Sequence, residues 1–182
     1  MIDDEIQCAT AILKAGGVVA HACEGVWGLA CDAYSFASVK RILELKRRPI
    51  RNGLILIGGR ATEFSAELAT LNATQRRTVM NSWPGPETWI MDTRRFPAWI
   101  TGRRGTVAVR VPGHEQAREL AQCFGGPLVS TSANRSGEEP NTRQEEVAES
   151  FGNLVDYLLP GTASGSTGPS RIRVAASGEV LR

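Results

Sequence analysis

The hydrophobic and polar positions of this chain alternate between helical spacing and short unbroken apolar runs. The apolar residues from Ile6 to Leu13 fall on one helical face, so the spacing predicts a helix over residues 3–15. The run GLILIG at residues 53–58 predicts a strand buried on both faces. The same reasoning predicts helices over residues 35–46, 62–68, 74–82 and 114–124, and strands over residues 18–23, 88–91, 106–111, 128–131, 154–159, 171–174 and 179–181.

The segments between these elements carry turn and capping residues. The glycines of residues 24–33 predict a loop, and the sequence WPGP at residues 83–86 predicts a rigid turn. Residues 161–168, rich in Gly, Ser and Thr, predict a mobile loop. Thr142 and Glu145 have the spacing of a capping box that opens a further helix. Because strands and helices alternate through most of the chain, we expect an α/β fold in one domain over residues 1–182.

The composition is that of an ordinary soluble globular protein. Of 182 residues, 42% are hydrophobic and 22% are charged, and 21 basic against 19 acidic residues give a net charge of +2. This balance is too even to predict nucleic-acid binding from composition alone. The start MIDDE is acidic, and no stretch of about 18 apolar residues exists, so we expect a cytoplasmic protein without a membrane partner.

The cysteines and histidines give little support for a metal site. No pair of the four cysteines has C-x-x-C spacing, and a chain of this size does not need disulfides, so reduced thiols are the simpler interpretation. We expect His21, Cys23 and Cys31 to be buried side chains rather than ligands, and no resident metal.

Four positive charges fall within six residues at the end of the second predicted helix, at Lys46, Arg47, Arg48 and Arg51. A cation at a helix C-terminus complements the helix dipole, and water can solvate the rest as a basic surface. The same cluster also suits a phosphate, because repulsion between its charges must be screened. Both interpretations are open from the residue types.

The sequence STSAN at residues 130–134 ends an apolar strand. Ligands of α/β folds gather at the carboxyl ends of strands, and the hydroxyls of Ser132 and its neighbours, with the Asn134 amide, can donate to an oxyanion. Alternatively, Ser and Asn side chains of a turn bond their own backbone. Neither alternative is excluded by the sequence.

Arg110 stands in the otherwise apolar strand VAVRV and should not be buried without a partner. It needs a carboxylate, which either a protein side chain or a ligand can supply. The chain has neither a P-loop nor a G-x-G-x-x-G turn, so a nucleotide would bind by another kind of site.

Six motifs in order resemble the YrdC/Sua5 family of threonylcarbamoyl-AMP synthases, in its short single-domain bacterial form. They are the strand and glycine loop of residues 18–32, the KxR motif and buried strand of residues 43–57, the WPGPxT turn of residues 83–88, the VxVRVP strand of residues 106–112, the SxN motif of residues 130–137 and the PS pair of residues 169–170. The resemblance covers nearly the whole chain.

The resemblance implies a twisted mixed sheet of parallel and antiparallel strands, flanking helices and a large, positively lined cavity. It also assigns three groups of site residues: catalytic Lys46, Arg48, Ser132 and Asn134; ATP-binding Lys46, Arg48, Asn52, Thr106, Asn134 and Thr142; and threonine-binding Cys23, Arg110, Ser132 and Ser170.

The implied reaction forms L-threonylcarbamoyladenylate and pyrophosphate from L-threonine, bicarbonate or CO2, and ATP, usually with Mg2+. Its product serves the threonylcarbamoyladenosine modification of tRNA, so a downstream transferase machinery is the implied partner. The alternative is a module that binds double-stranded RNA or tRNA during ribosome or tRNA maturation, and its affinity would fall steeply with salt.

The chain departs from the resemblance at residues 21–24, where it reads HACE and the family usually has YPTE. Cys23 therefore replaces a threonine expected near the substrate amino acid. A thiol is a weaker hydrogen-bond donor than a hydroxyl, so weaker threonine binding or a different amino acid is an open alternative.

Overall fold

Eight strands form one sheet within residues 2–164 and 168–182, which this computed structural model describes. The strands are β1 (Val19–Ala22), β2 (Trp27–Asp32), β3 (Ile55–Ile57), β4 (Glu87–Asp92), β5 (Thr106–Arg110), β6 (Leu128–Ser132), β7 (Tyr157–Leu158) and β8 (Arg171–Val174). The helices are α1 (Ile2–Lys14), α2 (Phe36–Leu45), α3 (Ser65–Leu68), α4 (Ala73–Asn81), α5 (Ala98–Thr101), α6 (Glu115–Phe124) and α7 (Gln144–Phe151), with 3-10 turns η1 (Ile50–Asn52) and η2 (Ala61–Phe64).

The sheet is mixed, with the strand order β7-β1-β2-β6-β3-β5-β4-β8. The pairs β1–β7, β3–β5 and β4–β8 are parallel, and the pairs β1–β2, β2–β6, β3–β6 and β4–β5 are antiparallel. This arrangement confirms the expected α/β fold with parallel and antiparallel strands. Because β6 lies between β2 and β3, a late strand of the chain joins two early ones.

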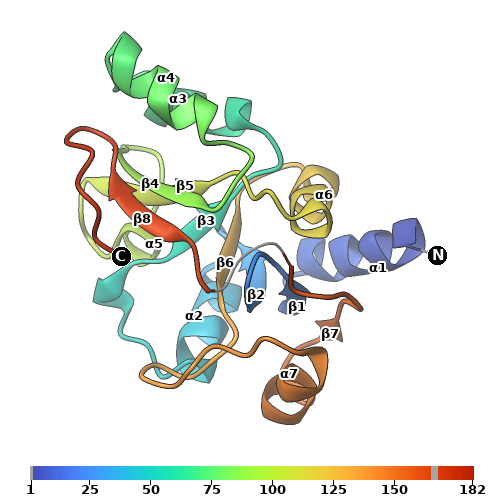
Figure 1. Cartoon of the computed structure of the whole chain (residues 1–182). Helices are drawn as coiled ribbons and strands as arrows, with labels where there is room; N and C mark the ends of the chain where they lie inside the picture. Colours follow the sequence, from blue (N-terminus) through green and yellow to red (C-terminus); the bar gives the residue numbers. More distant parts are fainter. Residues whose placement is uncertain (1, 165–167) are drawn as a thin grey trace.

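Two buried clusters pack on opposite sides of the sheet. α1 and α6 lie side by side (Figure 1), and Ile6 and Leu13 share one cluster with Leu120 and Leu128. The other cluster contains apolar residues of α2 together with Leu29, Leu56, Trp89 and Val109. None of the described helices is long and apolar enough to cross a membrane.

Capping residues of the sequence fix two of the helices. Ser35 is the N-cap of α2, and its hydroxyl accepts a hydrogen bond from the Ser38 N–H at 3.4 Å. α6 ends at Gly125, whose φ of 83° is the left-handed conformation that favours glycine at a helix C-terminus. The helices predicted over residues 35–46 and 114–124 are therefore confirmed.

The loop predicted over residues 24–33 is wrong, because this segment contains β2, whose first five residues are buried. A strand covered on both faces lacks polar alternation, so its sequence pattern does not distinguish it from a loop that contains glycine. The strand predicted over residues 154–159 shrinks to the two residues of β7. Residues 179–181 form no strand, only an isolated bridge between Val180 and Arg173.

The capping box predicted before α7 is displaced by one residue. Its N-cap is Arg143 instead of Thr142, and its partner is Glu146 instead of Glu145. The Thr142 N–H donates to Glu146 at 2.9 Å, so Thr142 supports the start of the helix from outside it. Of the mobile loop predicted over residues 161–168, residues 165–167 lie outside the described residues.

Candidate active site

A cavity of about 310 Å3 brings together most of the candidate residues. Its walls come from β2, β3, β5 and β6, from the segment between β1 and β2, and from the C-terminal residues. The candidates that line it are Cys23, Arg48, Asn52, Thr106, Arg110, Ser132 and Ser170. Among the described lining residues, Lys46, Asn134 and Thr142 are missing.

The strand register spreads these side chains along the cavity. β3 and β5 are parallel, with Ile55 opposite Ala108 and Ile57 opposite Arg110. Thr106 and Arg110 share one side of β5 and lie about 13 Å apart along it. The Gly53 carbonyl lies two residues before β3, toward the Thr106 end of this parallel pair, and accepts hydrogen bonds from Arg48 Nε at 3.3 Å and Nη2 at 3.0 Å. Arg48 is thus anchored at one end of β5 and Arg110 projects from the other.

Arg110 is held beneath the turn of residues 83–86 and is paired with Glu24. Its Nε donates to the Gly85 carbonyl at 2.9 Å, and its Nη2 forms an ion pair with Glu24 Oε2. The two side chains are only 6% and 9% exposed. Of the two carboxylate sources left open by the sequence, the structure contains the protein side chain.

The Glu24 carboxylate accepts from three donors at the cavity wall. Besides Arg110, the Cys23 thiol donates to it at 3.1 Å and the Gly113 N–H donates at 2.5 Å. Burial opposes ionisation of Glu24, but Arg110 and Cys23 hold its pKa below the ordinary value of 4.5. Burial raises the pKa of Cys23 to about 12, so at neutral pH its thiol keeps the proton that it donates.

Arg182 is a second cation of the cavity, and its charge affects the pKa of Arg48. Arg182 donates Nε and Nη2 to the Ser170 carbonyl at 3.3 and 3.1 Å. Burial lowers the pKa of both guanidinium groups, and the Arg182 charge lowers that of Arg48 further. No described carboxylate forms an ion pair with either group. Two cations that lie close together without an acid create a potential that attracts an anion.

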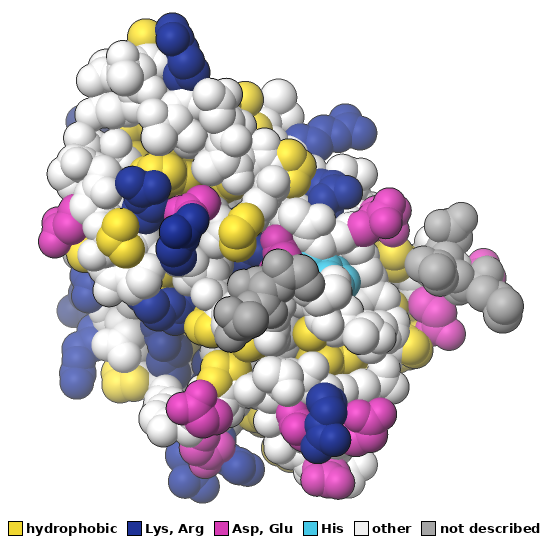
Figure 2. Space-filling view, in the orientation of Figure 1, with side chains coloured by type: hydrophobic (Ala, Val, Ile, Leu, Met, Phe, Trp, Pro, Cys, Tyr) yellow, Lys and Arg dark blue, Asp and Glu magenta, His cyan; other side chains and the backbone are white. Residues whose placement is uncertain are grey.

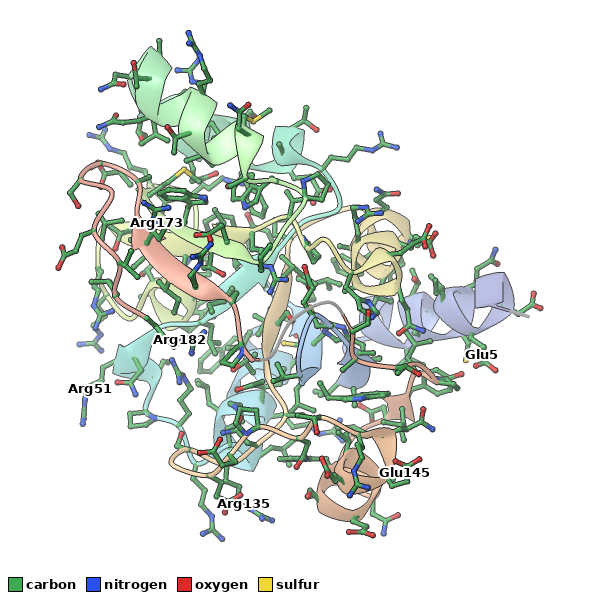
Figure 3. The ribbon with its side chains drawn as sticks, in the orientation of Figure 1. Glu5, Arg51, Arg135, Glu145, Arg173 and Arg182 are labelled. Atoms are coloured by element: carbon green, nitrogen blue, oxygen red, sulfur yellow. The ribbon has the colours of Figure 1, made fainter. Side chains whose placement is uncertain are left out.

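The arginine side chains near the cavity do not all point the same way. Figure 3 shows Arg182 beside β8, whereas Arg51 points away from the molecule. In Figure 2 Lys and Arg side chains gather over β8 and the C-terminal segment, and acidic side chains gather over α7 and near α1. The basic character predicted for the site is therefore local.

Lys46 lies behind the cavity wall. Its Nζ donates to the carbonyls of Ser132 and Asn134 and, at 3.2 Å, to Asn134 Oδ1. The residue is 2% exposed. Burial, together with the charge of Arg48, lowers the pKa of Lys46 to about 8. Lys46 thereby ties the end of α2 to the segment that carries Ser132.

The side chains of the SxN motif bond one another and their own backbone. Ser132 Oγ donates to Asn134 Oδ1 at 2.6 Å, and Asn134 Nδ2 donates to the carbonyls of Arg135 and Glu138 at 3.0 and 2.7 Å. This is the backbone-bonding alternative for these turn residues. Ser132 reaches the cavity, and Asn134 fixes its orientation from behind.

Among the charged lining residues, Glu24 and Arg182 were not candidates from the sequence. Glu24 was detectable, since Arg110 required a carboxylate and HACE offered one. Arg182 belongs to no motif. It reaches the cavity because the C-terminal segment returns along β8, where the Ile172 N–H donates to the Arg182 carbonyl at 3.0 Å.

The donor set of the cavity does not suit a resident magnesium ion. Glu24 is the only carboxylate among the described lining residues, and three donors already occupy it. Mg2+ is usually held by one or two carboxylates together with substrate phosphates. Elsewhere in the described part of the chain, no group of three His, Cys, Asp or Glu side chains is placed to hold a metal.

Comparison with known proteins identifies the family. A model of the Sua5/YciO/YrdC domain, described as "Telomere recombination", matches residues 11–182. The threonylcarbamoyl-AMP synthase of Halorhodospira halophila is 46% identical over 178 residues, which are 97% of this chain and 93% of that protein. The corresponding protein of Hahella chejuensis is 44% identical over 178 residues and 97% of each chain.

A solved structure supports the same assignment. The crystal structure of P. abyssi Sua5 complexed with L-threonine superposes with a TM-score of 0.87 at 31% identity, and the match covers 93% of this chain. The chain spans 50% of that Sua5 chain, about half of its length. The chain therefore belongs to the Sua5/YciO/YrdC family.

Proposed function

We propose that residues 1–182 form one cytoplasmic threonylcarbamoyl-AMP synthase, which makes L-threonylcarbamoyladenylate and pyrophosphate from L-threonine, bicarbonate or CO2, and ATP. The carrying observation is a single cavity in which the unpaired cations Arg48 and Arg182 accompany the buried Arg110. Relatives named threonylcarbamoyl-AMP synthase and a Sua5 structure with L-threonine support the proposal.

The reaction needs no side-chain nucleophile. The threonine nitrogen adds to the carbon of CO2 and loses a proton, which gives a carbamate. A carbamate oxygen then attacks the α-phosphorus of ATP, the bond to the bridging oxygen of the β-phosphate breaks, and pyrophosphate leaves. The protein must neutralise charge on the phosphate oxygens and hold both reactants in line.

The phosphates are assigned to the end of the cavity that contains Arg48. Arg48 and Arg182 supply charge there, Asn52 and Thr106 supply amide and hydroxyl donors, and Ser132 can donate only when its hydroxyl turns away from Asn134. Lys46 and Asn134 act by holding Ser132. Thr142, exposed at the start of α7, can reach only a nucleotide that extends beyond the cavity. Mg2+ would enter with the phosphates of ATP.

The amino acid is assigned to the end that contains Arg110. The Nε and Nη2 of Arg110 are used by Gly85 and Glu24, which leaves Nη1 to donate to the threonine carboxylate. Ser170 lines the same cavity and shares a hydrogen bond of 2.8 Å with the buried Thr88 hydroxyl. The buried walls exclude water, which protects the labile carbamate.

The proposal is tested by mixing the purified protein with ATP, bicarbonate and one amino acid at a time. Pyrophosphate release should require both threonine and bicarbonate, and mass spectrometry should find threonylcarbamoyladenylate. Release without any amino acid would indicate ATP hydrolysis and contradict the proposal.

The same assay separates the second candidate function, an RNA-binding module. The basic surface of Figure 2 is the observation in its favour. Threonine-dependent turnover without RNA supports the synthase, and the tRNA-modifying transferase machinery would then consume its product. Absence of turnover, with RNA affinity that falls steeply as salt rises, supports the binding module.

Cys23→Thr is expected to preserve activity or to lower the KM for threonine. The Cys23 thiol donates to Glu24 at 3.1 Å, and a hydroxyl in its place is a stronger donor to the same carboxylate. Cys23→Ala, which removes the donor, is the matched variant and should raise this KM. Loss of turnover in a folded Cys23→Thr protein would show that residue 23 does not occupy the assumed place beside the amino acid.

A further inference from the structure

The side chains of His21 and Ser130 contact each other across β2, a strand to which neither residue belongs. His21 lies on β1, pairs with Gly28 of β2, and Gly28 in turn pairs with Ser132 of β6. His21 Nε2 lies 3.1 Å from Ser130 Oγ. A Cβ at Gly28 would stand 3.0 Å from His21 Nε2 and 3.2 Å from Ser130 Oγ. The missing side chain of Gly28 therefore opens the space in which the two residues bond.

The hydrogen bonds of His21 define its tautomer. Its Nδ1 lies 2.9 Å from the Ala22 carbonyl, which only accepts, so Nδ1 must carry a proton. In a neutral imidazole the other nitrogen then has a lone pair and accepts. Nε2 therefore accepts from Ser130, and the serine hydroxyl must donate its proton toward His21.

The surroundings of His21 keep the ring neutral. The residue is completely buried, and burial lowers its pKa to about 4, although the bond to Ala22 raises it. The charged or titratable groups that act on it are His114 and Arg110, which lower the pKa, and Glu24, which raises it. Arg110 and Glu24 form the buried ion pair of the cavity, so His21 lies near the end of the cavity that is assigned to the amino acid.

We infer that His21 is a positioning residue that holds the Ser130 hydroxyl with its proton turned away from the cavity, so that Ser130 accepts a hydrogen bond from the amine of the bound amino acid. This inference rests on the proposed function for the presence of an amino acid in the cavity. Ser130 lines that cavity and presents only lone pairs to it.

The amine is the group of an α-amino acid that such a hydroxyl selects. Carboxylate and phosphate oxygens carry lone pairs and would be repelled, whereas an amine carries N–H donors. Glu24 is the only carboxylate among the described residues that line the cavity, and Arg110, Cys23 and Gly113 already donate to it. Ser130 therefore supplies an acceptor that the ion pair does not.

The tautomer can be measured on the unliganded protein by 15N–1H correlation spectra of the histidine rings. His114 provides an internal contrast, because its Nδ1 accepts from the Ala117 N–H at 3.4 Å and its Nε2 faces the Thr162 carbonyl at 3.0 Å. At pH 7 we expect a proton on Nδ1 of His21 and on Nε2 of His114, with His114→Gln giving the assignment. A proton on Nε2 of His21 would overturn the inference.

Binding of L-threonine, measured by calorimetry without ATP, tests the contact itself. Ser130→Ala should weaken it about tenfold, the loss expected for a hydrogen bond to a charged group. His21→Leu should weaken it less, because the freed hydroxyl rotates, and His21→Gln should restore it, since its carbonyl oxygen can accept from Ser130. When His21→Leu is added to the Ser130→Ala variant, the affinity for threonine should not fall further.

A second ligand identifies the group that Ser130 contacts. L-2-aminobutyrate has the amine of threonine but no side-chain hydroxyl. The tenfold effect of Ser130→Ala should persist with it, and disappearance of the effect would assign the contact to the side chain and overturn the inference.

The readouts separate this inference from the proposed function. If the wild-type protein binds threonine and Ser130→Ala weakens this binding as expected, but the wild type releases no pyrophosphate, only the proposed synthase activity is contradicted. Equal losses of ATP and threonine affinity in His21→Leu, with a lower Tm and no rescue by His21→Gln, would mean that His21 is merely structural.

Discussion

Replacing Arg48 with alanine is expected to lower kcat/KM for ATP by at least about tenfold, because at least one charge-assisted hydrogen bond to a phosphate is lost. The same change should leave the Tm nearly unchanged. It removes the bond to Gly53, but it also relieves the repulsion that Arg182 exerts on Arg48. Steady-state pyrophosphate release and thermal unfolding measure the two quantities.

Arg51→Ala is the matched control for this experiment. Arg51 carries the same charge three positions away, but it is exposed and points away from the molecule (Figure 3). Arg182→Ala should resemble Arg48→Ala, because both cations act at the same end of the cavity. Similar losses in all three variants would indicate general attraction of ATP by a basic surface, and unchanged kinetics in Arg48→Ala would contradict a phosphate contact.

Separating Arg110 from Glu24 is expected to destabilise the protein and to abolish threonine-dependent turnover. Arg110→Met leaves a buried carboxylate without its cation, and removal of one partner of such a pair costs about 3–5 kcal/mol in the free energy of unfolding. The double variant Arg110→Met/Glu24→Leu should regain most of this stability, since apolar replacement of a buried pair is often neutral. Urea unfolding gives the stability of both variants.

Turnover distinguishes the two roles of the ion pair. If Arg110 binds the threonine carboxylate, the double variant is stable but inactive with threonine, while its affinity for ATP is retained. A double variant that still releases pyrophosphate with threonine would show that Arg110 is only a structural partner of Glu24.

The ion pair also predicts the sign of a pH effect. The pKa of Glu24 in the folded protein lies below its ordinary value of 4.5, so its contribution to stability is present above that pH. The contribution is lost as the pH falls from 4.5 through the folded pKa. The stability difference between the wild type and the double variant should therefore change in this interval, which unfolding curves at several pH values would reveal.

Local patterns predicted the elements whose faces differ in polarity. The spacing around Val39 and the cap at Ser35 were sufficient for α2, because a helix with one solvated face shows its period in the sequence. The mixed sheet followed from the resemblance, and of the clustered Lys46 and Arg48 the structure places Arg48 in the cavity lining and Lys46 behind it.

Other features depend on contacts between distant segments and leave no local pattern. The sequence did not predict β2, because both of its faces are covered and its pattern resembles that of a loop. Gly28 lacks a side chain because His21 of β1 and Ser130 of β6 occupy the space that a Cβ would fill. Arg110 demanded a carboxylate, but only the folded chain shows that Glu24 provides it. Arg182 belongs to no motif, and its place depends on how the last residues return along β8.

The position of β6 has a consequence for how the protein matures during synthesis. β6 pairs with β2 through Val129 and Cys31 and with β3 through Val129 and Leu56, so it closes a gap between segments made much earlier. Such non-local pairing is slow, because a long loop must be ordered before the contact forms. The wall that carries Ser130 and Ser132 is therefore absent from any nascent chain that ends before β6, and the cavity is incomplete until β6 has paired with both β2 and β3.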